Sequence, residues 1–194
     1  MNIEKILKRK YILASKSARR IKLLKQIGLK FKSVDSNFDE LELSYYNPVN
    51  LVLHNSENKA EIVAKKFSNE IVIGADTIVV INNKILNKPA NLSEAARYLS
   101  ELSGNIHTVF TGLCVIDLKL NKKIMGFEKT HVHFRIIPDD EIQYYVNKFK
   151  PLDKAGAYGI QDDFGCLFIK KIVGDYYNVV GLPLVNLFNI LKRL

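Results

Sequence analysis

The amino-acid sequence predicts an α/β fold with a mixed sheet and helices packed on it. In the first half, short apolar strands alternate with segments whose apolar residues recur at helical spacing, a pattern typical of α/β proteins. In the second half, two long β-rich segments, 108–117 and 124–137, predict an antiparallel ribbon. The length of 194 residues fits one domain, or one domain with two lobes about a cleft.

The segment 71–81, Ile-Val-Ile-Gly-Ala-Asp-Thr-Ile-Val-Val-Ile, organises the rest of the chain. Its β-branched runs are typical of a strand that is buried on both faces. Asp76 lies in the middle of this run, and a buried ionised carboxylate is costly unless it is paired or binds a metal. Asp76 is therefore the first functional candidate. In the alternative interpretation, residues 74–77 form a turn in which Asp76 accepts hydrogen bonds from backbone amides.

The N-terminal part predicts a strand, a serine-rich loop and a helix. Residues 10–14 form the expected strand, and the apolar residues within 21–27 have helical spacing up to Gly28, a natural helix stop. Ser15 or Ser17 is expected to be the N-cap of this helix.

Arg19 and Arg20 follow these serines, where a positive charge is unfavourable to the helix dipole. A bound anion would explain them, because a helix N-terminus presents free amides to phosphate. The alternative is a capped helix with two solvated arginines.

A second strand over 29–34 leads to the acidic loop 35–40, and a long helix is expected over 48–67. In the loop, Glu40 is a candidate ligand for a divalent cation, although acidic loops are usually only solvated. On the helix, Lys59 either reaches into a cleft or faces water.

The central strand is followed by a two-residue Asn-Asn hairpin turn at 82–83 and a short return strand. Asn91 and Glu94 resemble a capping box for a helix that runs to residue 102. In the ribbon, His131 and His133 share one face, a zinc-like spacing without a third ligand nearby, so they are interpreted as polar strand residues.

The C-terminal part continues with a helix from 138 to about 149, whose first-turn acids suit the helix dipole. A glycine-punctuated loop follows over 151–161, and glycines there permit close approach of a ligand. A strand over 166–172 and a helix over 183–194 complete the expected order.

Composition is that of an ordinary globular protein, with 47% hydrophobic and 25% charged residues. No apolar run reaches membrane-spanning length, and the basic N-terminus lacks the apolar core of a secretory signal. The two cysteines, Cys114 and Cys166, are expected to be reduced, which fits a cytoplasmic protein with no membrane partner. The net charge of +9 favours polyanionic partners such as nucleotides or nucleic acid.

The chain lacks the Walker A, dinucleotide-binding, nucleophile-elbow and zinc-protease motifs. What remains is a set of cations at the ends of expected elements, together with two carboxylates: Arg19, Arg20, Lys59, Lys88, Glu40 and Asp76. Such a set suits hydrolysis of a phosphoanhydride, because cations and a divalent metal offset the phosphoryl charge while a carboxylate activates water.

The chain resembles the Maf family of nucleoside triphosphate pyrophosphatases from about residue 13 to 187. The resemblance is carried by the order and spacing of several short motifs: Ala-Ser-Lys-Ser-Ala-Arg-Arg at 14–20, Gly-Ala-Asp-Thr at 74–77, Asn-Lys-Pro at 87–89, Leu-Ser-Gly-Asn-Ile-His-Thr-Val-Phe-Thr-Gly at 102–112, Asp-Lys-Ala-Gly-Ala-Tyr-Gly-Ile-Gln at 153–161 and Val-Gly-Leu-Pro-Leu at 180–184. It implies one domain over 1–194 with two lobes around a central cleft, often as a homodimer.

The resemblance also implies cleavage of a nucleoside triphosphate to the monophosphate and pyrophosphate with Mg²⁺ or Mn²⁺, as nucleotide house-cleaning. By position, Asp76 resembles the general base, and Glu40 a metal or catalytic carboxylate. Lys88 and four further residues resemble triphosphate contacts: Ser15, Arg19, Arg20 and Lys59.

Arg19, Thr77 and Gln161 match positions tied to substrate choice, and the Ile-Gln pair at 160–161 resembles the branch acting on dTTP and UTP. A glutamine amide both donates and accepts hydrogen bonds, which matches the N3–H and O4 edge of thymine or uracil. Two residues depart from the family pattern: Ala18 replaces a proline, and Asp162 replaces a glycine.

Two other functions stay open from sequence. The first alternative is a nucleic-acid-binding module, which the net charge of +9 suits, although the lysines are scattered along the chain. Such a module needs aromatic side chains that stack on bases, but the tyrosine pairs at 144–145 and 176–177 are equally well explained as core or surface residues of helices and loops. The second alternative function is that of an interaction protein in cell division, but no motif indicates a surface for its partner. The main prediction involves a nucleotide substrate and no nucleic acid.

Overall fold

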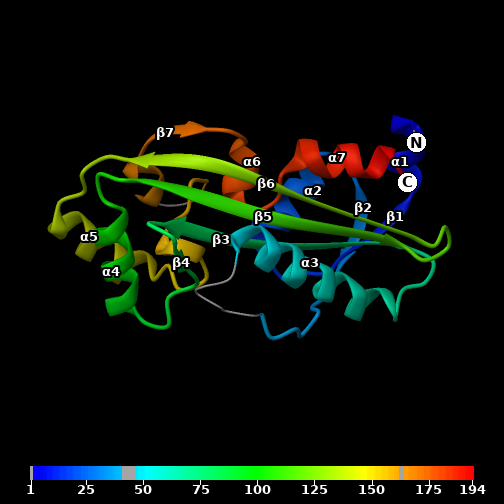
Figure 1. The fold of residues 1–194 in the computed structure, drawn as a ribbon, viewed down its shortest axis with the longest axis horizontal. Helices are drawn as coiled ribbons and strands as arrows, with labels where there is room; N and C mark the ends of the chain where they lie inside the picture. The colour runs from blue at the N-terminus through cyan, green and yellow to red at the C-terminus, as the bar shows by residue number, and fades with distance from the viewer. Residues whose placement is uncertain (1, 41–46, 162–163) are drawn as a thin grey trace.

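The computed structural model describes residues 2–40, 47–161 and 164–194, and its elements follow the α/β order that the sequence predicts (Figure 1). The strands are β1 (Lys10–Leu13), β2 (Lys30–Ser33), β3 (Ile71–Ile81), β4 (Lys84–Leu86), β5 (Ile106–Asp117), β6 (Lys122–Phe134) and β7 (Ile169–Val173). The α-helices are α1 (Ile3–Lys8), α2 (Ala18–Gln26), α3 (Pro48–Ala64), α4 (Leu92–Leu102), α5 (Asp139–Phe149), α6 (Tyr176–Val180) and α7 (Leu184–Lys192). Two 3₁₀ turns lie at Ala155–Ala157 and Phe164–Phe168.

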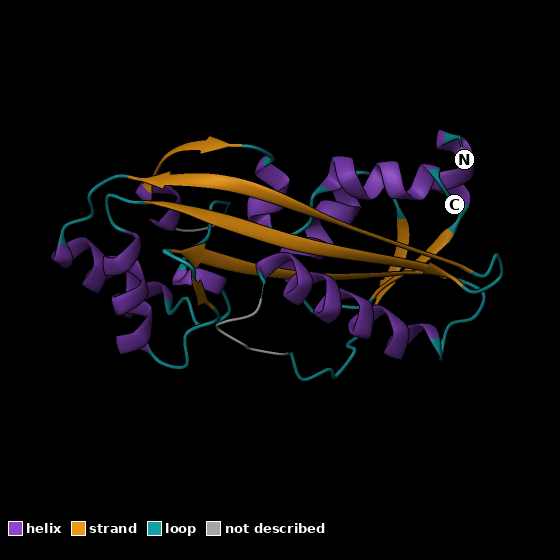
Figure 2. Cartoon of the chain, viewed as in Figure 1, coloured by secondary structure: helices purple, strands orange, loops and turns teal. Residues whose placement is uncertain are grey.

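Within the described ranges the strands form one seven-stranded mixed sheet in the order β2-β1-β3-β5-β6-β7, with β4 paired to β3. β1 pairs in parallel with β2 and β3, whereas β3, β5, β6 and β7 pair antiparallel. The three longest strands, β3, β5 and β6, run the length of the molecule (Figure 2). The predicted mixed α/β class is confirmed.

One edge of β3 is shared by two short strands that leave a gap between them. β1 pairs with residues 71–73 of β3, and β4 pairs with residues 79–81. β5 covers the other edge along residues 71–80. Among the described residues, no strand pairs with residues 74–78 on the β1 side of β3. Within these ranges, Asp76 therefore lies in a part of β3 that has a neighbouring strand, β5, on one side only.

The two faces of β3 contact different layers because successive side chains of a strand point to opposite faces. Ile71, Ile73 and Ala75 belong to a buried cluster with α2 and α7, whereas Val72 belongs to a cluster with α3. Asp76 therefore faces α3. A third cluster joins the far end of β3 to α4 and α5. Figure 1 shows α4 and α5 at one end of the long sheet and α2 and α7 toward the other, which corresponds to the expected two lobes.

Two glycines allow α3 to lie very close to the sheet. A Cβ on Gly74 would come 2.2 Å from the carbonyl oxygen of Ser56, and a Cβ on Gly112 would come 2.2 Å from that of Val52. Gly112 lies directly opposite Asp76 in the β3–β5 register. Larger residues at either position would push α3 away, so these glycines set the distance between the helix and the carboxylate.

Several expected elements differ in detail. The strand expected over 71–81 is confirmed, and the alternative interpretation of residues 74–77 as a turn is wrong, because that segment continues β3. The strand expected over 166–172 is wrong in its first part, where residues 164–168 form a 3₁₀ turn before β7. The two asparagines at 82–83 both have positive φ, as the hairpin turn requires.

Two short helices were not expected from the pattern. α1 contributes a single buried apolar residue, Ile6, and α6 is a five-residue turn between two glycines, so neither shows extended periodicity. No helix within the described ranges is long and apolar enough to span a bilayer.

Candidate active site

All nine residues that the sequence singles out line one pocket of about 570 Å³ at the gap in the edge of β3. They come from the loop after β1 and the start of α2, from the acidic loop, α3, β3, and the loops at 87–91 and 151–161: Ser15, Arg19, Arg20, Glu40, Lys59, Asp76, Thr77, Lys88 and Gln161. The fold thus brings together segments that are far apart in the sequence.

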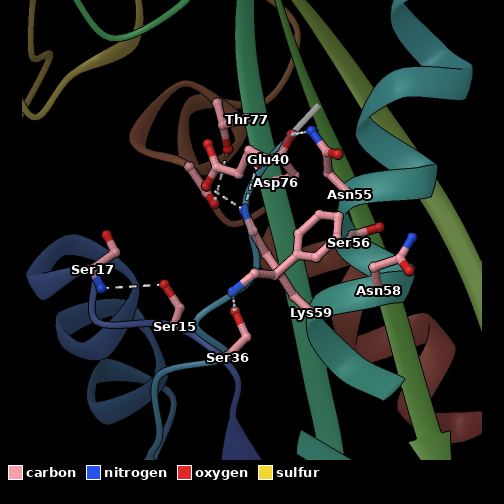
Figure 3. A network of polar contacts seen from close by, with 12 residues as sticks. Ser15, Ser17, Ser36, Glu40, Asn55, Ser56, Asn58, Lys59, Asp76 and Thr77 are labelled. Atoms are coloured by element: carbon pink, nitrogen blue, oxygen red, sulfur yellow. Dashed lines mark hydrogen bonds and ion pairs between the residues drawn. The ribbon is translucent and has the colours of Figure 1, made fainter. Parts of the chain in front are cut away.

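Asp76 is buried and is held by two side chains of α3. Lys59 Nζ lies 2.6 Å from Asp76 Oδ1, and Asn55 Nδ2 donates to Asp76 Oδ2 over 3.0 Å. Asn55 and Lys59 are one helical turn apart, so they lie on the same face of α3. Figure 3 shows these side chains converging from the helix on the strand. The carboxylate is therefore not capped by its own backbone neighbours, as the turn interpretation required.

Glu40 completes the charged cluster from the acidic loop. Its Oε1 lies 2.6 Å from Lys59 Nζ, and its Oε2 lies 3.4 Å from Lys88 Nζ. Burial alone would raise the pKa of Glu40, but the charge and hydrogen bond of Lys59, with Lys88 and Arg20, outweigh it and lower the pKa to about 2. Glu40 is therefore ionised at neutral pH, and one ammonium stands between two carboxylates.

Arg20 is buried and its guanidinium is used largely for internal contacts. Nε donates to the backbone oxygen of Gly181 over 2.8 Å, Nη2 to Thr77 Oγ1 over 3.0 Å, and Nη1 to Ser15 Oγ over 3.3 Å. The N-cap of α2 is Ser17, whose Oγ accepts from the backbone N–H of Arg20, whereas Ser15 Oγ accepts from that of Ser17. Of the two expected caps, Ser17 is confirmed.

Arg19 crosses the pocket mouth to the glycine-punctuated loop. Its Nη1 lies 2.7 Å from Asp153 Oδ2, and its Nη2 donates to the backbone oxygen of Asp153 over 3.1 Å. Lys154 pairs with the other carboxylate oxygen of Asp153 at 3.0 Å. Burial raises the pKa of Asp153, but these two cations outweigh it and lower the pKa.

The pocket is less charged toward the α4–α5 lobe. Val79, Val109 and Tyr158 line this part, and the exposed Gln161 lies on the wall formed by the 151–161 loop. The pocket therefore combines a charged region around Lys59 with a less charged region lined by Val79, Val109 and Tyr158.

The carboxylates fit a hard divalent cation. Glu40 and Asp76 both approach one positive group, Lys59 Nζ, so their oxygens converge. Within the described part of the chain, no three His, Cys, Asp or Glu side chains gather as a metal site. Mg²⁺ suits such a site, because one or two carboxylates bind it while substrate phosphates and water complete its shell.

Sequence reasoning did not identify Asn55 or Asp153. Asn55 could have been found from its spacing of four residues from Lys59 on a predicted helix. Asp153 is acidic in a loop, and nothing local indicates that it contacts Arg19, which is 134 residues away. Ala18, one departure from the family pattern, begins α2, and Asp162, the other, lies outside the described residues.

Comparison with known proteins identifies the family of this chain. The family model described as Maf-like protein matches residues 10–194. A dTTP/UTP pyrophosphatase of Thermoanaerobacter sp. (strain X514) is 49% identical over 185 residues, which cover 95% of this chain and 96% of the relative. A dTTP/UTP pyrophosphatase of Dictyoglomus thermophilum is 44% identical, with 97% of each chain covered.

Among solved structures, the Ham1 protein of Staphylococcus aureus superposes with a TM-score of 0.46 and 12% identity, covering 65% of this chain and 72% of that one. The family match spans nearly the whole sequence, and the relatives match it at close to full length. This chain belongs to the Maf-like protein family.

Proposed function

We propose that this protein hydrolyses nucleoside triphosphates, above all dTTP and UTP, to the monophosphate and pyrophosphate. The observation that carries the proposal is Asp76, a buried carboxylate at the open gap of β3, in a pocket whose walls supply Lys59, Lys88 and Arg19. Relatives that are 44% and 49% identical bear the name dTTP/UTP pyrophosphatase, which supports the same substrate class here.

The charge of the pocket suits a triphosphate. Lys59, Lys88 and Arg19 approach from α3 and from two loops, so they can contact different phosphoryl groups of one ligand. Cations fixed by the fold stabilise the negative charge on the oxygens of the transferring phosphoryl group and on the leaving pyrophosphate. Lys59 is already held by two carboxylates and so needs little reorganisation.

In the proposed reaction, a water molecule attacks the α-phosphorus and the bond from that phosphorus to the α–β bridging oxygen breaks. Asp76 accepts the proton of the attacking water, and pyrophosphate leaves with the electron pair of the broken bond. Asn55 donates to one oxygen of Asp76, which fixes the carboxyl plane and leaves lone pairs for the water.

Glu40 and Asp76 would hold a divalent cation, Mg²⁺ or Mn²⁺. When bound, the cation offsets phosphate charge and polarises the reacting phosphoryl group. Glu40 suits this role because its pKa of about 2 keeps it ionised across the physiological range.

The preference for dTTP and UTP is assigned to Gln161, which lines the pocket from the 151–161 loop. Its amide can donate to O4 and accept from N3–H of thymine or uracil. A homodimer and nucleotide house-cleaning follow from the family resemblance, and a cytoplasmic location follows from the two unpaired cysteines of the sequence; all three stay predictions.

The test is a panel of canonical and modified nucleoside triphosphates assayed with Mg²⁺ or Mn²⁺, scoring pyrophosphate separately from orthophosphate. We expect pyrophosphate and monophosphate in equal amounts, fastest from dTTP and UTP. Release of orthophosphate alone would indicate cleavage of the terminal phosphate and contradict the proposal. Chelation of the divalent cation should abolish turnover.

Gln161→Glu is the matched variant for substrate choice, since it changes an amide to a carboxylate of the same length. It should lower dTTP turnover relative to GTP turnover, because a carboxylate only accepts hydrogen bonds. An unchanged dTTP-to-GTP ratio would remove Gln161 from base recognition.

A further inference from the structure

A chain of hydrogen bonds runs from the pocket into the core through two threonines that lie opposite each other on β3 and β5. Thr77 lines the pocket, and Thr111 is its direct partner in the antiparallel register and is fully buried. Their Oγ1 atoms are 3.0 Å apart. Thr111 Oγ1 also donates to the backbone oxygen of Asn178 in α6 over 3.3 Å.

The donors and acceptors around Thr77 fix the direction of its hydroxyl proton. Arg20 Nη2 donates to Thr77 Oγ1 over 3.0 Å, and an arginine has no acceptor, so one lone pair of Thr77 is used there. The hydroxyl has a single proton and two inward acceptors, Thr111 Oγ1 at 3.0 Å and the Gly181 oxygen at 3.4 Å.

The nearer acceptor is also the less occupied one. The Gly181 oxygen already accepts from Arg20 Nε over 2.8 Å. Thr111 gives its own proton to Asn178 and therefore has lone pairs available to Thr77. The polarity of the chain thus runs from Thr77 through Thr111 to Asn178, away from the pocket.

This direction leaves Thr77 with one lone pair and no proton for a ligand. We propose that Thr111 is a positioning residue that makes Thr77 a hydrogen-bond acceptor in the pocket, and thereby favours bases with an N–H at the edge they present. Uracil and thymine have a donor at N3, whereas cytosine has an acceptor there. This inference rests on the proposed function and adds Thr111 to the residues behind its pyrimidine choice, beside Thr77 and Gln161, which the family resemblance ties to substrate choice.

The test compares Thr111→Val with Thr111→Ser and with Thr108→Val. Valine matches the shape of threonine but removes the hydroxyl, so the proton of Thr77 loses its nearer acceptor. Only the more distant Gly181 oxygen, already occupied by Arg20, then competes with a ligand for that proton. Serine restores the hydroxyl. Thr108 lies on the same strand, pairs with His131 through its Oγ1 and is outside the pocket lining, so it controls for loss of a strand hydroxyl.

We expect the ratio of kcat/KM for UTP to that for CTP to fall about tenfold in Thr111→Val, the usual scale of one hydrogen bond. The ratio should stay within about twofold of the wild-type value in Thr111→Ser and Thr108→Val, a change too small to reflect a lost hydrogen bond. A general loss of packing would lower both rates and leave the ratio unchanged. If the valine variant does not fold, Thr111→Ala removes the same hydroxyl.

The dissociation constants of UMP and CMP, measured by calorimetry for the same variants, separate this inference from the proposed function. If the wild-type protein releases no pyrophosphate from UTP, the proposed function fails, yet the affinity ratio of UMP to CMP still decides the role of Thr111. An unchanged ratio in Thr111→Val, an equal change in Thr108→Val, or no recovery in Thr111→Ser would overturn it.

Discussion

Helix α3 takes part in two clusters in which one lysine stands between two carboxylates. In the pocket, Lys59 of α3 lies 2.6 Å from both Glu40 and Asp76, and its side chain is only 7% exposed. On the outer side of the helix, Lys123 of β6 pairs with Glu57 and Glu61 of α3, and its side chain is 43% exposed.

The difference between the clusters lies in their access to water. Solvent screens the Lys123 cluster, so its ion pairs contribute little to stability, although the hydrogen bonds that Lys123 donates to Glu57 and Glu61 raise the pKa of Lys123. In the Lys59 cluster, Glu40 stays partly exposed, but Lys59 and Asp76 have lost most of their hydration, and the desolvation of these two charges offsets much of their attraction. A protein that needed only stability would do as well with apolar side chains there, so the buried cluster points to chemistry.

The largest expected effect comes from removing the central ammonium of each cluster. Lys59→Met leaves Asp76 buried without its counter-charge, and we expect the free energy of unfolding to fall by about 3 kcal/mol. Lys123→Met should change it by at most about 1 kcal/mol, because its carboxylates return to water. Urea unfolding at neutral pH measures both. Equal losses in the two variants would show that burial does not distinguish the clusters.

The sequence predicted the buried cluster better than it predicted the outer one, for a physical reason. Asp76 interrupts an apolar segment, and this contrast is visible in the sequence without any knowledge of the fold. Glu57, Glu61 and Lys123 are polar residues on surface elements, and nothing in their spacing indicates that β6 lies beside α3.

The site was predictable as a set of residues, but its geometry was not. The gap in the edge of β3 depends on where β1 and β4 end, and the approach of α3 depends on Gly74 and Gly112, which were not assigned that role. Partners far apart in sequence, such as Asp153 and Arg19, have no local signal. The short helix α6 was not predicted because its five residues are too few to show helical periodicity.

The comparison extends to a buried titratable side chain that has no ion-pair partner in the described part of the chain, His107. His107 is buried beside Tyr158, with Nε2 2.7 Å from the tyrosine oxygen, and within the described residues its Nδ1 has no hydrogen-bond partner. Burial, with a smaller contribution from His133, lowers the pKa of His107 from 6.5 to about 3. The folded protein thus holds His107 neutral where the unfolded chain binds a proton.

Stability should therefore fall as the pH decreases below 6.5, by up to about 1.4 kcal/mol per pH unit from this residue. In His107→Gln the slope between pH 6.5 and 4.5 should be shallower, because glutamine does not titrate. Unfolding free energies across this range measure it, with His131→Gln on the exposed face of β6 as the matched control. An unchanged slope in His107→Gln would mean that the ring is protonated in the folded state.

The smallest expected effect belongs to Glu40, which is partly exposed. Its pKa is about 2 in the folded protein and 4.5 in the unfolded chain, so its contribution to stability is present above pH 4.5 and is lost as the pH falls toward 2. Glu40→Gln should flatten the stability curve in that window alone. A curve that flattens above pH 4.5 instead would assign the acid loss to a different group.

The most direct test of the central claim is the turnover number of Asp76→Asn with UTP and Mg²⁺, measured by pyrophosphate release on protein shown to be folded by circular dichroism. The amide keeps the shape of the carboxylate and removes its capacity to accept a proton. We expect kcat to fall by about 10²–10⁴, the usual scale for loss of a general base. A folded variant with kcat within threefold of the wild-type value, roughly 0.7 kcal/mol in the barrier, would show that the buried carboxylate does not act in the reaction.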